Sequence, residues 1–109
     1  MYKKRAVEFY EKALALHEKG NLSAAEKAYK KAIKTDGSLA EAYNNLGRAL
    51  QDLGKLDEAV ASYHKALGLK PDLADAHNTL GVVKENLGSQ EEANASKHKD
   101  LDVAPDYAE

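Results

Sequence analysis

A segment of 34 residues recurs along the chain and limits its fold more than any other feature. Residues 40–73 and 74–107 align without a gap and are identical at 16 of 34 positions. Residues 6–39 align with 40–73 at 10 of 34 positions, again without a gap. Such a period is typical of repeat proteins, in which each unit packs against its neighbours. The period divides the chain into an N-terminal extension, residues 1–5, and three units.

Each unit reads as two helices joined by a turn. Gly20, Gly54 and Gly88 occupy the same repeat position, and glycine is common just after a helix ends. The six helices are expected near residues 3–19, 23–35, 39–53, 57–69, 73–87 and 91–103. The side chains expected to cap helix starts are those of Ser23, Ser38, Asp57 and Asp72.

The apolar positions of the middle unit predict how its two helices pack. Tyr43, Leu46, Gly47 and Leu50 follow the i, i+3, i+4, i+7 spacing of one helix face, and Ala59, Tyr63 and Ala66 line the second helix. Gly47 and Ala59 are small where the two helices must cross closely. A single pair cannot bury both apolar faces, so the sequence predicts an all-α, right-handed stack of pairs.

This pattern resembles the tetratricopeptide repeat family over most of the chain. The middle unit carries the motif residues Tyr43, Leu46, Gly47, Leu50, Gly54, Ala59, Tyr63, Ala66 and Pro71. The third unit keeps Leu80, Gly81, Gly88, Ala93 and Pro105, whereas the first has Lys12 where the family has leucine. The resemblance implies a right-handed superhelical solenoid of three helix-turn-helix units, at 6–39, 40–73 and 74–107. It also implies that the first helix of each unit lines a concave groove for a peptide or protein.

The residues that the resemblance places in the groove suggest its chemistry. Those expected to bind the partner are Tyr10, Leu14, His17, Asn44, Asn45, Arg48, Asp52, Asn78, Thr79, Val82, Glu85 and Asn86. The same helix faces also carry Val7, Glu11, Glu18, Glu41, Gln51 and Asp75. These positions hold six carboxylates and one arginine, which favours a basic or neutral extended segment.

Two subfamilies offer closer comparisons. Repeat domains that clamp the acidic tails of heat-shock chaperones use lysine, arginine and asparagine side chains at set groove positions. Asn45 matches one asparagine, but Tyr10, Leu14, Asp75 and Thr79 stand at the other positions, so such a clamp is not expected here. The middle unit is also similar to the arrays of O-linked N-acetylglucosamine transferases and related bacterial proteins. In those arrays a recurring asparagine binds peptide backbone, and Asn45 occupies that position.

Composition and motifs favour no other class of function. The formal net charge of −2 gives no general attraction to nucleic acid or membranes, although Lys27, Lys30, Lys31 and Lys34 form a basic run. His64 and His98 occupy equivalent repeat positions two helix layers apart and cannot share a metal. No catalytic or phosphate-binding motif occurs. We therefore expect no catalysis, metal or cofactor, and a cytoplasmic location by default because no targeting signal is evident.

Three polar residues distinguish the second helix of the third unit. Asn94, Lys97 and Asp100 replace Val60, Tyr63 and Ala66, which suggests a polar cap on the last helix. The preferred function is a non-catalytic interaction module that binds a peptide or protein. The substrate-selecting arm of a larger enzyme, such as a glycosyltransferase, and a self-associating scaffold stay open as alternatives.

Overall fold

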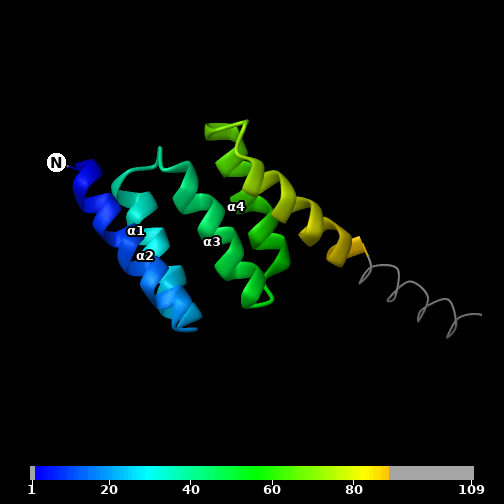
Figure 1. Ribbon diagram of the computed structural model, residues 1–109, viewed down its shortest axis with the longest axis horizontal. Coiled ribbons are helices and arrows are strands. Elements are labelled where there is room, and N and C mark those ends of the chain that lie inside the picture. The colour runs from blue at the N-terminus through cyan, green and yellow to red at the C-terminus, as the bar shows by residue number, and fades with distance from the viewer. Residues whose placement is uncertain (1, 89–109) are drawn as a thin grey trace, which may run out of the picture.

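The computed structural model describes residues 2–88, with side chains from residue 4 onward. Figure 1 shows successive helices lying side by side as antiparallel pairs. The helices are α1 (Tyr2–Glu18), α2 (Leu22–Thr35), α3 (Ala40–Asp52), α4 (Leu56–Leu69) and a fifth helical segment at 74–88. Each of these helices begins within one residue of its predicted start, and the part of the chain described contains no strand. The expected helix at 91–103 and its capping residues Asn94, Lys97 and Asp100 lie outside this part.

The two glycines that close the helix pairs adopt a left-handed backbone conformation. Gly20 has φ +82° and Gly54 has φ +81°, a region that residues with a side chain rarely occupy. The amide of Gly20 donates to the carbonyl of His17 at 3.0 Å, and the next amide, of Asn21, donates to Leu16 at 2.9 Å. The same two bonds recur around Gly54. This is the Schellman arrangement, and it confirms the turn positions predicted from the repeat.

The side-chain caps predicted for α2, α3 and α4 are wrong. The residues that precede α2, α3 and α4 are Asn21, Leu39 and Lys55, and none of them makes a side-chain capping bond. Ser23 and Asp57 already lie inside α2 and α4. The glycine turn starts the next helix two residues later, too early for either side chain to cap it. The Ser38 hydroxyl instead donates to Asp36 at 2.6 Å.

Close packing of the second helix pair depends on Gly47, as the sequence predicts. A Cβ atom placed on Gly47 would lie 2.7 Å from Cε1 of Tyr63, closer than side chains approach. Tyr63 is fully buried, and its hydroxyl donates to Gln51 at 3.0 Å. The ring therefore fills the space that a side chain on α3 would need.

The burial of one stripe of residues distinguishes the first helix pair from the helices that follow. Ala42, Leu46 and Ala49 of α3 are buried, as are Ala76, Leu80 and Val83 at the same positions 34 residues later. The equivalent residues of α1 are Glu8, Lys12 and Ala15, and all three are exposed. α3 packs against both α2 and α4, whereas α1 packs mainly against α2 among the described helices. Lys12 therefore lies on a side of α1 that no described helix covers. The unusual lysine is thus explained by its place in the stack.

A buried carboxylate joins the two helix pairs. Glu26 of α2 is only 9% exposed, and its oxygens accept from Lys30 at 2.7 Å and from Lys55 at 3.0 Å. Lys55 precedes α4, so this second bond spans the boundary between the pairs. The hydrogen bond from Lys30 is the main reason that the pKa of the Glu26 carboxyl lies below its usual range, and Lys55 lowers this pKa further.

Candidate functional site

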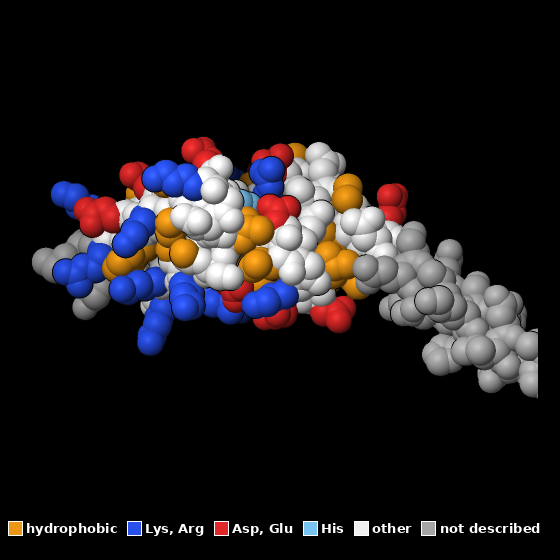
Figure 2. All heavy atoms as spheres, turned by 90° about the horizontal axis from the view of Figure 1, so that it is seen from below, with side chains coloured by type: hydrophobic (Ala, Val, Ile, Leu, Met, Phe, Trp, Pro, Cys, Tyr) orange, Lys and Arg blue, Asp and Glu red, His pale blue; other side chains and the backbone are white. Residues whose placement is uncertain are grey.

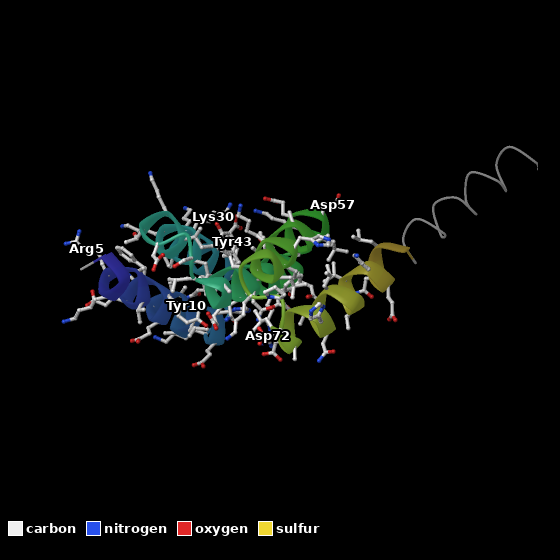
Figure 3. All side chains as sticks on the ribbon, turned by 90° about the horizontal axis from the view of Figure 1, so that it is seen from above. Arg5, Tyr10, Lys30, Tyr43, Asp57 and Asp72 are labelled. Carbon is white, nitrogen blue, oxygen red and sulfur yellow. The ribbon has the colours of Figure 1, made fainter. Side chains whose placement is uncertain are left out.

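A pocket of about 240 Å³ lies on the face where α1 and α3 are neighbours. The residues that line it are Leu14, His17, Glu18, Asn45 and Arg48. Four of them were predicted to bind the partner, and Glu18 was placed on the same face. The Figure 3 view separates this face from α2, because Tyr10 of α1 and Lys30 of α2 lie toward opposite edges of the molecule.

Asn45 is held in place by its own amide nitrogen. Nδ2 donates to the Tyr10 hydroxyl at 2.8 Å and to the Glu41 carbonyl at 2.9 Å. These bonds use both hydrogens of the amide, so only its Oδ1 atom is left to accept from a ligand. The Tyr10 hydroxyl accepts from Asn45 and keeps its own hydrogen for donation. Asn45 and Tyr10 therefore present an acceptor and a donor side by side.

His17 connects the two helix pairs from the floor of the pocket. Its Nε2 atom lies 2.9 Å from Oδ2 of Asp52, and its Nδ1 atom lies 3.2 Å from the Tyr29 hydroxyl. Both ring nitrogens are therefore occupied by side chains of the protein, as is one oxygen of Asp52. His17 and Asp52 were both predicted to contact the partner. In this structure they are hydrogen-bonded to each other, and His17 lines the pocket.

An aromatic cluster underlies these polar groups. The Tyr29 ring centroid lies 6.1 Å from that of Tyr10 and 6.1 Å from that of His17. Burial is the main reason that the pKa of the Tyr29 hydroxyl is raised to about 12, and Tyr10 adds to this effect while Arg48 opposes it. The hydroxyl is thus neutral near pH 7 and can share a hydrogen with His17. Tyr29 is not among the residues predicted to line the groove, so its part in the site was missed.

Arg48 is the cation of the pocket. Its side chain is exposed and has no carboxylate within 4 Å among the described residues. Its positive charge opposes the rise in the pKa of the Tyr29 and Tyr63 hydroxyls that burial causes. Its guanidinium donors are available for the carbonyl or carboxylate oxygens of a ligand.

Asn44 is the predicted binding residue that the structure corrects. It is only 4% exposed, and its Oδ1 atom has no hydrogen-bond partner within the described part of the chain. The neighbouring Asn45 is turned toward the pocket, whereas the helical rotation of about 100° per residue carries Asn44 into the packed side of α3. Asn44 therefore cannot contact a partner without local rearrangement.

The third row of predicted residues lies on helical segment 74–88, apart from the pocket. The exposed ones are Asn78, Val82, Glu85 and Asn86. Thr79 is partly buried, and its hydroxyl donates to the Asp75 carbonyl at 2.7 Å. None of these five side chains lines the pocket between α1 and α3, so their part in binding stays a prediction.

The fold and this face define a class of protein, a helical repeat solenoid built from antiparallel helix pairs. The family model described as TPR repeat matches residues 13–54 and again residues 47–88. The chain therefore belongs to the tetratricopeptide repeat family. No curated protein matches the sequence. Among the described residues no helix combines the length and the apolar character needed to cross a bilayer.

Solved structures with the same fold differ in what their descriptions record. The Arabidopsis OM64 TPR domain is 25% identical with a TM-score of 0.79, and the match covers 96% of this chain and 87% of that one. The first TPR of Spaghetti (RPAP3) bound to the HSP90 peptide SRMEEVD is 29% identical with a TM-score of 0.74, covering 76% of this chain and 66% of that chain. MamA is 28% identical with a TM-score of 0.75, covering 94% of this chain and 60% of its own. This chain thus spans about two thirds of the length of the Spaghetti domain and less than two thirds of that of MamA.

Proposed function

We propose that the chain is a non-catalytic interaction module that binds an extended peptide or protein segment across α1 and α3. The observation that carries this proposal is the pocket in which the Oδ1 atom of Asn45 and the guanidinium of Arg48 have no partner among the described residues. An extended peptide offers an N–H and a C=O at each residue. Asn45 can accept from such an N–H, and Arg48 and the Tyr10 hydroxyl can donate to a C=O.

The charges of the site favour a basic or neutral segment. Glu18 lines the pocket beside Arg48, and Glu85 is exposed on the neighbouring segment. The Spaghetti domain is described with the acidic peptide SRMEEVD. Among the described residues Arg48 is the one lysine or arginine that lines the pocket, and the two carboxylates would repel a strongly acidic peptide. The preferred ligand is therefore an extended segment whose residues at the pocket are uncharged or basic.

Selection of ligands from a displayed peptide library tests the proposal. Asn45→Ala combined with Arg48→Ala should remove the capture of selected peptides, because the replacement deletes the free acceptor and the free cation together. His64→Ala combined with Lys65→Ala is the matched control, since both side chains are exposed on α4. Thermal melting should show that both double variants are folded. Undiminished capture by the Asn45 and Arg48 variant would place the binding site elsewhere.

A further inference from the structure

A second and larger pocket opens between α1 and α2, outside the proposed groove. Its volume is about 350 Å³, and apolar atoms from Phe9, Leu16 and Ala28 form much of its lining. Three lysines complete the lining, Lys12 of α1 with Lys27 and Lys31 of α2. We call this site the basic pocket. No residue of the proposed groove contributes to it.

Among the described residues three lysines form ion pairs, and those of the basic pocket are not among them. Lys30, Lys55 and Lys70 each form an ion pair at 2.7 to 3.2 Å. Among the described residues no carboxylate lies within 4 Å of the three lysines of the basic pocket. The Lys31 ammonium lies 4.9 Å from the Phe9 ring centroid, so a cation stands over an aromatic face.

The surrounding charge has the same sign. Residues 4–39 carry eight lysines or arginines and five aspartates or glutamates, whereas residues 40–88 carry five and seven. Formal charge is thus +3 over the first segment and −2 over the second. Figure 2 shows the excess of blue side chains over the α1 and α2 end, with hydrophobic side chains visible between them.

The second helix pair has no equivalent of this site. The counterparts of Lys12 and Leu16 are Leu46 and Leu50, which are 5% and 2% exposed. The counterpart of Lys27 is Ala61. Of the three lysines, Lys31 has a cationic counterpart in the second pair, Lys65. The opening and the cluster of three lysines around it are not reproduced in the second pair.

We propose that the basic pocket docks an acidic peptide segment that places one apolar side chain against Phe9 and Leu16. Carboxylates on either side of that anchor would meet Lys12, Lys27 and Lys31. Charge complementarity favours this occupant, because the pocket combines an apolar floor with cations that have no carboxylate partner among the described residues. A bilayer or a duplex is a poorer match, since each extends over a wide area and the negative charge of residues 40–88 would oppose it.

Fluorescence anisotropy with a labelled synthetic peptide tests this site. The probe carries a central phenylalanine flanked by glutamates, and two further peptides replace either the glutamates by glutamine or the phenylalanine by serine. Lys27→Glu combined with Lys31→Glu should weaken binding of the probe about tenfold or more, as two reversed ion pairs predict. Lys65→Glu combined with Lys84→Glu makes the same change of net charge on other helices and should alter the affinity less than about twofold.

Several results would overturn the assignment. Equal weakening by both double variants would show attraction to net charge alone, and equal binding of the serine peptide would remove the role of the apolar floor. Tighter binding of anionic vesicles or duplex DNA than of the probe would assign the lysines to another ligand. A mass above that of a monomer in light scattering, lost in the Lys27 and Lys31 variant, would assign the pocket to a second copy. Asn45→Ala with Arg48→Ala should leave probe binding unchanged, which separates this site from the proposed groove.

Discussion

Gly47 offers the most direct test of how the second helix pair is packed. In Gly47→Ala the new Cβ atom would lie 2.7 Å from Cε1 of Tyr63 and 2.9 Å from its Cδ1 and Cζ atoms. The ring is fully buried and its hydroxyl is bound to Gln51, so it has little freedom to move. Overpacking of this kind costs about 1–3 kcal/mol. Alanine recovers about 1 kcal/mol of helix propensity, and with the contact near the severe end we expect a net loss of about 1–2 kcal/mol.

Circular dichroism during heating measures this loss, which should lower the melting temperature by roughly 5–10 °C. Gly81→Ala is the matched control, because Gly81 has the same repeat position and a Cβ there would meet no atom of residues 2–88 within 4 Å. That variant should melt slightly higher than the parent protein. The first pair already has alanine at this position, Ala13, so the clash depends on the local spacing of α3 and α4. If Gly47→Ala melts as high as Gly81→Ala, the proposed contact with Tyr63 is wrong.

Two further predictions concern the polar groups that join the helix pairs. The lowered pKa of Glu26 means that its ion pairs stabilise the fold above the ordinary carboxyl pKa of 4.5 and stop doing so as the pH falls through the lowered value. The urea midpoints of the parent protein and of Glu26→Gln should therefore differ at pH 7 and converge in acid. A difference that stays constant with pH would contradict this role. His17→Ala leaves the buried Tyr29 hydroxyl without its partner and should reduce the free energy of unfolding by about 1–3 kcal/mol. His17→Gln should lose less, because Gln51 makes the equivalent bond to Tyr63, and equal losses in urea titrations would show that this bond is unimportant.

The sequence determined the helix pairs and their turns. A gap-free period with glycine at one position predicts where each pair closes, since the left-handed residue of a Schellman turn strongly favours glycine. It also predicted the close approach at Gly47, because this glycine lies on the apolar face of its helix where the two helices of the pair must cross. The capping residues were mistaken because two backbone bonds of the turn, and no side chain, fix where the next helix starts. Local side-chain preference was overruled by the geometry of the turn.

Only the tertiary structure decided which groove residues remain available to a ligand. Asn44 and Asn45 are adjacent amides in the sequence, yet one is buried and the other lines the pocket. His17 and Asp52 are 35 residues apart in the sequence, and their side chains are hydrogen-bonded to each other. The basic pocket likewise depends on one side of α1 not being covered by another described helix. For this reason Lys12, which replaces a leucine of the repeat, lines a charged pocket. A residue's type and repeat position are local properties, whereas its burial and its partners depend on which other helix packs beside it.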